Sequence, residues 1–391
     1  MPTSTEVDQG AFISATLFDP NFKTPYSQNW NIGIQRQLTT SLTLEVNYVG
    51  VKGTRLFRVV DGNPPQPGLV SQLVAFCVPG NPNNTGFGVA ANPTFGTADG
   101  QCNQSTITFT NLSFGQEFGV LPFDAVNNNA FGSVAAALNK SIGNSTYNGL
   151  QVNLQKRLSN GFQIQGAYTY AHSIDDINDP LVPGAGNRSF PRNSSDLAAE
   201  RGNSDFDIRH RGVVNFIYEP NVGKGRGHLS EGFVGRVLEG WSITGLVSAQ
   251  TGHPYDIFGN RDSNHTGLSA RATIIGSPSQ PAGTDKTFTG PALSAFELTP
   301  YNQQSNLSKN FFYGPNEVNV DSALLKNTSI TERAKLQLRF EFFNLFNHTQ
   351  FGQPGNSIAA PGTFGLSTST LTRPDGTTSA RQIQVAAKFI F

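Results

Sequence analysis

The densest group of carboxylates in this sequence follows an alternating polar and apolar segment that ends near residue 172. Asp175, Asp176 and Asp179 lie close together, with Asn178 between the last two. Carboxylate and amide oxygens are the ligands that Ca²⁺ prefers, but this spacing does not follow the EF-hand pattern. We therefore expect a polar extracellular loop here, with a cation site as the alternative.

A second charged group directly precedes another alternating segment. Asp205 and Asp207 are followed by Arg209, His210 and Arg211. Opposite charges at this spacing predict an ion-pair network at the rim or in the lumen of a barrel, if the strands close into one. A substrate-facing role is the alternative, because charged lumen residues tune selectivity.

The other candidate residues lack the spacing that chemistry requires. Gly223-Lys-Gly-Arg-Gly227 is glycine-rich and basic without the spacing of a phosphate-binding loop, so we expect a solvated turn. No GxSxG, HExxH, Walker or GxGxxG motif occurs. None of the six histidines has a second at metal-ligand spacing: His172, His210, His228, His253, His265 and His348. We predict no catalytic site, no cofactor and no metal, so the protein is not expected to be an enzyme.

The two cysteines, Cys77 and Cys102, lie in one stretch rich in Asn, Gly and Pro. A loop disulfide is one interpretation if the compartment is oxidising, and two unrelated free thiols are the other. No CxxC pair is present.

The elements that must position these residues are strands with strict alternation. In Lys335–Phe342, Leu336, Leu338 and Phe340 alternate with polar side chains. Successive side chains of a strand point to opposite faces, so each such segment has one apolar and one polar face. Nine segments show this pattern: 27–38, 42–50, 147–158, 162–172, 208–219, 240–251, 318–326, 334–346 and 381–391.

The composition of the two faces favours a membrane barrel. Charged residues are only 14% of the chain, and the polar faces are mostly Gln, Asn, Thr and Ser. No apolar run approaches the ~20 residues of a membrane-spanning helix, whereas a membrane β-strand needs only ~10 alternating residues. Lys plus Arg and Asp plus Glu are both 27, so no charge attraction to nucleic acid is expected.

Aromatic side chains lie near the ends of the predicted segments, where an interfacial girdle would lie. Trp30 and Trp241 are near segment starts, and Tyr48, Tyr168 and Tyr170 are near segment ends. In Phe343-Asn-Leu-Phe-Asn347 the alternation fails, which predicts a strand exit or a bulge at the rim, with Asn turning the chain.

The connections fall into two classes of length. If the chain ends in the periplasm and each segment crosses once, every long connection lies outside the cell and every short turn inside, as in outer-membrane barrels. The long connections are 52–146, 173–206, 252–317 and 347–379, the short ones are 39–41, 159–161 and 326–333, and 219–239 is intermediate.

The count of nine predicted strands is odd, and bacterial barrels normally have an even number. The N-terminus also lacks the basic start and continuous apolar core of a signal peptide. We therefore expect upstream strands to be missing. Residues 1–20 are expected to be a loop remnant or a disordered N-terminus, and residues 21–391 the C-terminal portion of the barrel.

Six blocks over roughly residues 20–391 resemble Oar-like TonB-dependent receptors, outer-membrane barrels that often carry an N-terminal carboxypeptidase-regulatory-like domain. The matching blocks are Tyr26-Ser-Gln-Asn-Trp-Asn-Ile-Gly-Ile-Gln-Arg-Gln-Leu38, Tyr147-Asn-Gly-Leu-Gln-Val-Asn-Leu-Gln-Lys-Arg-Leu158, Asp205-Phe-Asp-Ile-Arg-His-Arg211, Gly240-Trp-Ser-Ile-Thr-Gly245, Leu338-Arg-Phe-Glu-Phe-Phe-Asn-Leu-Phe-Asn-His-Thr-Gln-Phe351 and Gln382-Ile-Gln-Val-Ala-Ala-Lys-Phe-Ile-Phe391.

The resemblance implies an all-β, antiparallel transmembrane barrel in the outer membrane of a Gram-negative bacterium. It further implies outer-membrane lipid, the barrel assembly machinery that reads the terminal Phe391, an N-terminal plug and the TonB energy-coupling system as partners. No stretch of this sequence matches a plug or a coupling motif.

Three functions remain open at this point. The first is active uptake of a large or scarce substrate through a plugged channel. The second is cell-surface interaction or adhesion through the long loops without transport, and the third is a soluble, secreted all-β protein.

Overall fold

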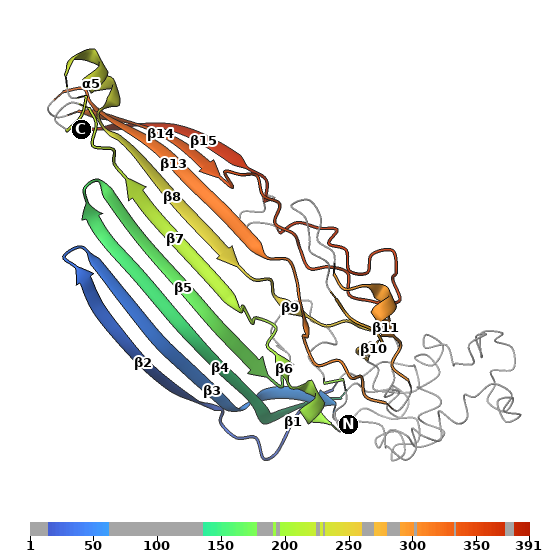
Figure 1. Cartoon of the computed structure of the whole chain (residues 1–391). Helices are drawn as coiled ribbons and strands as arrows, with labels where there is room; N and C mark the ends of the chain where they lie inside the picture. The colour runs from blue at the N-terminus through green and yellow to red at the C-terminus, as the bar shows by residue number, and fades with distance from the viewer. Residues whose placement is uncertain are drawn as a thin grey trace, which may run out of the picture.

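The computed structural model describes residues 15–61, 136–177, 191–192, 196–223, 227–229, 231–259, 270–279, 290–300, 303–331, 334–371 and 379–391. Nine long strands follow one another as neighbours in a single twisted sheet (Figure 1). They are β2 (Tyr26–Thr39), β3 (Leu42–Asp61), β4 (Ala136–Ser159), β5 (Phe162–Asp175), β7 (His210–Tyr218), β8 (Trp241–Gln250), β13 (Glu317–Ser329), β14 (Lys335–Phe343) and β15 (Gln382–Ile390). Each of the nine predicted segments is therefore a strand, and each pairs antiparallel with the next.

The ladder register places the alternating side chains of all nine strands on two common faces. Residues directly opposite one another in a ladder point to the same side of the sheet. One row across the sheet consists of Ile164, Phe216, Gly245, Ser322, Phe342 and Ile383. A row on the other face consists of Glu45, Asn153, Ala167, Val213, Ser248 and Asn319. The sheet thus has a mainly apolar face and a mainly polar face.

The turns that join neighbouring strands are short at one end of the sheet, the end where the chain also terminates (Figure 1). Asn160 and Gly161 form the β4–β5 turn, the short connection predicted at 159–161, with positive φ values of 52° and 73°, as an Asn-Gly hairpin turn requires. The helix α5 (Gly232–Leu238) lies at the same end, within the β7–β8 connection that the sequence left unassigned. No helix in the described ranges is long and apolar enough to cross a bilayer.

The strands β3 and β4 extend well beyond the segments predicted for them. Residues 51–61 pair with 137–147, across register shifts near Leu56. Arg55 has a φ of 57° at this irregularity. The sequence pattern stops near residue 50 because Lys52 and Thr54 occupy the next positions on the apolar face, and the extra residue at the bulge then interrupts strict alternation.

Within residues 1–20, the range predicted as a loop remnant or disordered N-terminus, residues 1–14 lie outside the described part of the chain. Residues 15–18 form the short strand β1 (Ala15–Phe18), which pairs parallel with the start of β4. This segment is therefore a strand, because the extension of β4 supplies its partner.

The described residues of the connections at the other end of the sheet are packed rather than structureless. We call the described residues of 191–209, 251–316 and 344–381 the loop layer. It contains η3 (Leu197–Glu200), β6 (Gly202–Asn203), β9 (Pro254–Tyr255), β10 (Thr273–Ile274), η4 (Leu293–Ala295), β11 (Phe296–Glu297) and β12 (Phe312–Tyr313).

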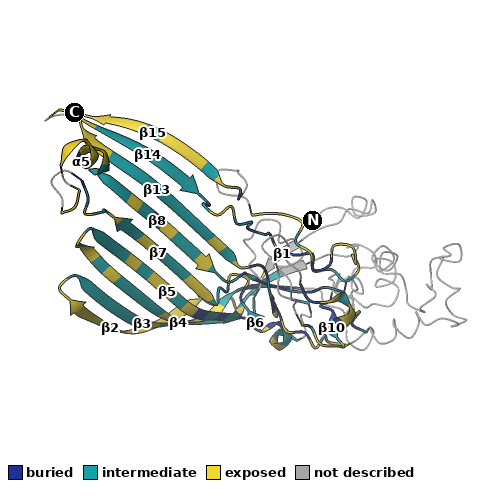
Figure 2. Ribbon diagram, turned by 45° about the horizontal axis from the view of Figure 1, so that its top comes forward, coloured by how far each residue is buried: buried dark blue, intermediate teal, exposed yellow. Residues whose placement is uncertain are grey.

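The loop layer has its own apolar core. Its buried members are Tyr255, Ile257, Ala272, Ala295, Phe296, Leu307, Phe312 and Phe364. Figure 2 shows that buried residues concentrate in this layer and at the adjoining ends of β3, β4 and β5, whereas most other strand residues are intermediate or exposed. The sequence pattern did not reveal this core, because its residues come from short segments without periodicity.

Candidate functional site: a polar cavity beneath the loop layer

Three polar side chains lie in one row where the polar face of the sheet meets the loop layer. Arg211 of β7 is opposite Gln250 of β8, and Gln250 is opposite Glu317 of β13. Neighbouring strands are ~4.8 Å apart, so the backbones at Arg211 and Glu317 are separated by about 10 Å. A cation and a carboxylate therefore flank a central amide.

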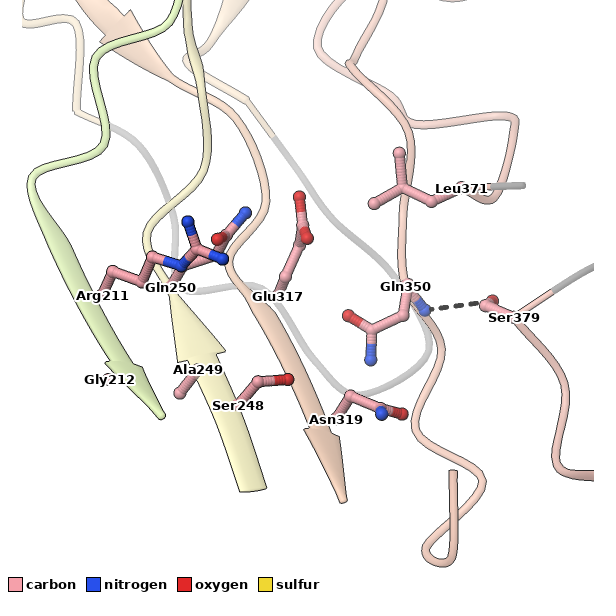
Figure 3. Close-up of a pocket in the computed structure, with 10 residues that line it drawn as sticks. All are labelled: Arg211, Gly212, Ser248, Ala249, Gln250, Glu317, Asn319, Gln350, Leu371 and Ser379. Carbon is pink, nitrogen blue, oxygen red and sulfur yellow. Dashed lines mark hydrogen bonds between the residues drawn. The ribbon is translucent and has the colours of Figure 1, made fainter. Parts of the chain in front are cut away.

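These side chains line a cavity of about 460 Å³ (Figure 3). Ser248 and Asn319 form the next row on the sheet. The other lining residues are Gly212 and Ala249 of the strands and Gln350, Leu371 and Ser379 of the β14–β15 connection. Gln350 joins the loop to the sheet, because its side-chain oxygen accepts from the Val318 amide at 3.1 Å. The backbone amide of Gln350 also donates to Ser379 Oγ at 3.4 Å.

Within the described part of the chain, the side chains of Arg211, Gln250 and Glu317 make no hydrogen bond or ion pair with the protein. Their neighbour Asn319, by contrast, donates to Asp321 at 2.9 Å. A guanidinium offers five donors, a carboxylate only acceptors and an amide both. The cavity can therefore bind a polar ligand with an anionic group at one end and a hydrogen-bond donor at the other.

Of the ion-pair network predicted at residues 205–211, the Asp207–Arg209 pair is present, and it lies at the edge of the loop layer. Asp207 is buried and accepts from the Ser173 amide at 2.6 Å and from the Tyr313 hydroxyl at 2.8 Å. Arg209 donates to the Tyr313 hydroxyl at 2.6 Å, and its Nε is 3.4 Å from an Asp207 oxygen. Only Arg211 of the cluster lines the cavity, which leaves it as the substrate-facing candidate.

These contacts shift the pKa values of two groups in the network. Burial lowers the pKa of Arg209, but the Tyr313 hydroxyl and the Asp207 carboxylate raise it above its ordinary value overall. Burial raises the pKa of Tyr313, its contact with Arg209 opposes this rise, and its hydrogen bond to Asp207 adds to it. Arg209 therefore stays charged and Tyr313 neutral, as both hydrogen bonds require.

The carboxylates predicted as a polar loop or cation site have protein partners where they are described. Asp175 is buried within β5, and its oxygen is 2.5 Å from the ammonium of the buried Lys309. Asp176 accepts from the Asn144 amide at 2.7 Å and lies 3.9 Å from the Arg58 guanidinium. Asn178 and Asp179 lie outside the described residues, and the described residues contain no cluster of metal-ligating side chains.

The strongest ion-pair group was not predicted. Arg271 is buried and donates to Glu200 at 2.7 Å and to Asp256 at 3.0 Å. Asp256 also accepts from the Asn310 amide at 2.7 Å. Burial lowers the pKa of Arg271, but the Asp256 and Glu200 carboxylates raise it above its ordinary value. The partners come from separate loops, so no local spacing could have indicated them.

The structure confirms the predicted strand exit at residues 343–347. β14 ends at Phe343, and Asn344 and Asn347 both have positive φ. The buried Asn344 side chain donates to the carbonyls of His348 and Ser379, at 2.8 and 2.6 Å. Asn344 thereby ties the start of the last long connection to its end.

The remaining predicted residues are dispersed. Gly223 and Gly227 belong to a turn in which the Gly223 amide donates to the His228 carbonyl at 2.9 Å, and residues 224–226 lie outside the described part. His172 contacts Asn203 and His210 contacts Tyr168, with no His pair at a common site among the described residues. Cys77, Cys102 and His265 lie outside the described residues.

The aromatic residues predicted at strand ends lie at two heights along the strands. Trp241 and Tyr218 lie at the short-turn end of β8 and β7. Tyr48, Leu150 and Tyr170 form one row at the other level, although β3 and β5 continue past it. Beyond this row the same face carries Lys52, Asn148 and His172. The prediction is confirmed for Trp241, the first residue of β8. It was wrong for Tyr48, Tyr168 and Tyr170, because β3 and β5 extend beyond the apolar part of the face.

A family model described as the outer membrane beta barrel domain matches residues 2–384. The chain belongs to the outer membrane β-barrel domain family. It is located in the outer membrane, its fold is antiparallel and all-β, and the described strands do not close into a barrel. In this family context the apolar face is the one that contacts lipid and the polar face lines the interior. The soluble, secreted alternative is thereby excluded.

Solved structures of outer-membrane proteins are also similar to this β-barrel chain. The outer membrane transporter YddB from Escherichia coli is 8% identical, with a TM-score of 0.41, over 97% of this chain and 34% of that one. The pyoverdine receptor FpvA from Pseudomonas aeruginosa is 12% identical, with a TM-score of 0.40, over 94% of this chain and 30% of that one. The chain thus spans about a third of the length of these structures. A comparison with curated proteins finds no match.

Proposed function

We propose that this chain forms the distal strands of a TonB-dependent receptor that takes up a large or scarce substrate, with the loop layer on the extracellular side. The cavity at Arg211, Gln250 and Glu317 carries this proposal. It lies on the interior face, directly beneath the loop layer, and its three polar side chains have no partner among the described residues. A substrate moving through the barrel would exchange its water contacts for these groups.

The six Oar-like blocks support the finer assignment. They lie in β2, β4, β8, β14, β15 and the segment before β7, so they cover the sheet from one edge to the other. On this proposal the plug and the energy-coupling motif belong to sequence outside these 391 residues. Phe391, whose side chain is almost fully exposed, is the proposed contact with the barrel assembly machinery. We propose no catalytic role for any residue.

A surface-interaction function is the second candidate, and one observation favours it. The loop layer exposes several large apolar side chains although it has a packed core: Phe206, Ile275, Phe311 and Phe346. Exposed aromatic side chains are typical anchors of protein interfaces. In this alternative the loop layer binds a surface partner and nothing is transported.

The experiment separates these functions in the source bacterium. Deletion of the full gene should leave at least one compound of a complex growth medium undepleted, as measured by mass spectrometry of the spent medium. Deletion of the energy-coupling gene should have the same effect. Arg211→Gln and Glu317→Gln in the chromosomal gene should also reduce this depletion, because each removes a charge from the cavity.

Arg36→Gln is the matched control, since Arg36 is exposed and lies on the lipid-facing side of β2, in the row of Leu44. It should leave depletion unchanged. Unchanged depletion in the gene deletion, together with lost adhesion to surfaces or cells, would reject transport and support the interaction function.

A further inference from the structure

The helix α5 is placed at the short-turn end of the sheet and fastened to its apolar side. Trp241 Nε1 donates to the Val237 carbonyl at 2.8 Å. Lys326 Nζ donates to the same carbonyl at 2.9 Å, to the Arg236 carbonyl at 3.3 Å and to the Glu239 carbonyl. A cation at a helix C-terminus is favourable, because the last carbonyls lack partners within the helix.

The two anchoring side chains belong to the lipid-facing side of the barrel. Trp241 and Lys326 are opposite each other in the β8–β13 ladder, two residues from the Ile243–Leu324 pair. Residues two apart in a strand share a face, so all four lie on the apolar face. The Lys326 ammonium lies 5.5 Å from the Trp241 ring centroid. The C-terminus of α5 is thus held at the edge of the lipid-facing surface and not over the interior.

The helix turns its apolar side chains away from the protein. Gly235 is buried, whereas Phe233 is 81% exposed, Val234 56% and Val237 47%. At ~100° per residue, Phe233 and Gly235 are about 200° apart around the helix axis. The side of α5 that carries Gly235 therefore faces the barrel, and a cluster of three exposed apolar residues faces outward. Leu229, just before the helix, adds a fourth at 63% exposed.

We propose that α5 is an interfacial helix that inserts Phe233, Val234 and Val237 into the bilayer surface at the short-turn end. The lipid-facing surface of the strands continues into this cluster through Trp241, a residue type that favours the membrane interface. A short amphipathic helix held parallel to the interface buries its apolar side at the boundary between headgroups and acyl chains. The helix would thereby fix the depth of this end of the barrel. This inference depends on the family and not on transport.

The occupant is lipid rather than a second protein because the cluster is continuous with a surface that lipid already covers. Seven residues are too few for a stable helix in water. The carbonyl contacts of Trp241 and Lys326 hold the backbone in place, so the exposed side chains can be presented to the bilayer at little cost in ordering.

The test uses nitroxide spin labels on the full-length protein in native outer membranes. Phe233→Cys and Val237→Cys are each labelled in a background of Cys77→Ser and Cys102→Ser. Collision rates with oxygen and with a water-soluble nickel complex are then measured by electron paramagnetic resonance. Leu150→Cys in the lipid-facing row of β4 is the lipid reference, and Thr40→Cys in the β2–β3 turn is the aqueous reference.

Labels at residues 233 and 237 should collide often with oxygen and rarely with nickel, as the label at residue 150 does. Frequent nickel collisions, matching those at residue 40, would place α5 in water and overturn the proposal. Low rates with both reagents would show that a protein covers the helix, which would also overturn it. All four sites are exposed, so the labels should be tolerated, and recovery in the outer-membrane fraction checks assembly.

Discussion

Two tyrosines in the loop layer show that a hydroxyl group stabilises the fold when it is hydrogen-bonded and destabilises it when it is buried without a partner. The Tyr255 hydroxyl is buried and has no hydrogen-bond partner among the described residues. The Tyr313 hydroxyl bonds both Arg209 and Asp207. We expect Tyr313→Phe to lower the free energy of unfolding of the loop layer by about 1–3 kcal/mol, because it removes the hydroxyl that donates to Asp207 and accepts from Arg209. Tyr255→Phe should be neutral or stabilising. Limited proteolysis of intact outer membranes at increasing temperature measures both, and equal losses in the two variants would contradict the prediction.

Tyr255 also predicts that the stability of the loop layer depends on pH. Burial raises the pKa of Tyr255, so the folded loop layer favours the neutral phenol. This contribution to stability is complete below the unfolded pKa of about 10 and is lost as the pH rises through the folded value. The protease resistance of the parent loop layer should therefore fall above about pH 10. The fall should be smaller in Tyr255→Phe, and identical alkaline profiles would count against it.

Arg271 tests the value of a buried ion pair against an exposed one. Removing Arg271 leaves the buried Glu200 and the nearly buried Asp256 without their cation. We expect Arg271→Ala to cost the loop layer about 3–5 kcal/mol. Arg339→Ala is the matched control, because Arg339 pairs with Glu341 from a side chain that is 42% exposed. It should cost no more than about 1 kcal/mol. Comparable proteolysis midpoints in the two variants would show that the Arg271 group contributes little.

At the scale of elements, two glycines with positive φ distinguish the cost of a steric clash from the intrinsic cost of a left-handed backbone conformation. Gly161 has a φ of 73°, and a Cβ there would lie 2.1 Å from the Glu219 carbonyl oxygen. Gly232 has a φ of 68°, with nothing within 4 Å of its Cβ position. Gly232→Ala should therefore cost only the ~1–2 kcal/mol of the left-handed conformation. Gly161→Ala must also displace the neighbouring strand end. It should reduce the amount of folded, heat-modifiable barrel in outer membranes well below that of Gly232→Ala, and equal amounts would refute this.

The strands could be predicted because period-2 alternation is local and survives wherever a sheet has one apolar face. The same signal failed at residues 51–61 and 136–146, where a bulge breaks the alternation and the partner is distant. It also missed α5, whose helical conformation depends on Trp241 and Lys326. Among the residues that line the cavity, only Arg211 could be identified as a candidate from the sequence. Gln250 and Glu317 join it through a register that no local pattern specifies.

At the scale of the whole molecule, the two sheet edges constrain how the barrel can close. In the described residues β2 pairs only with β3, and β15 only with β14. Every neighbouring pair between them is antiparallel. With nine strands in sequence, β2 and β15 therefore run in the same direction. Open edges are not tolerated in lipid, and an all-antiparallel barrel cannot close by joining two strands of like direction.

We therefore expect an odd number of further strands between β15 and β2 in the assembled barrel. Cysteine cross-linking in native outer membranes tests this, with Cys77 and Cys102 replaced by Ser. Ile34→Cys with Val46→Cys is the positive control, because these residues are opposite each other in the β2–β3 ladder. Ile34→Cys combined in turn with cysteine at each lipid-facing position of β15 should give no cross-link: Ile383, Val385, Ala387 and Phe389. A cross-link within one chain would show that β2 joins β15 directly as a parallel pair. A cross-link between two chains would show that a second copy closes the barrel. Either result would overturn the all-antiparallel closure on which the expectation rests, since both join strands of like direction.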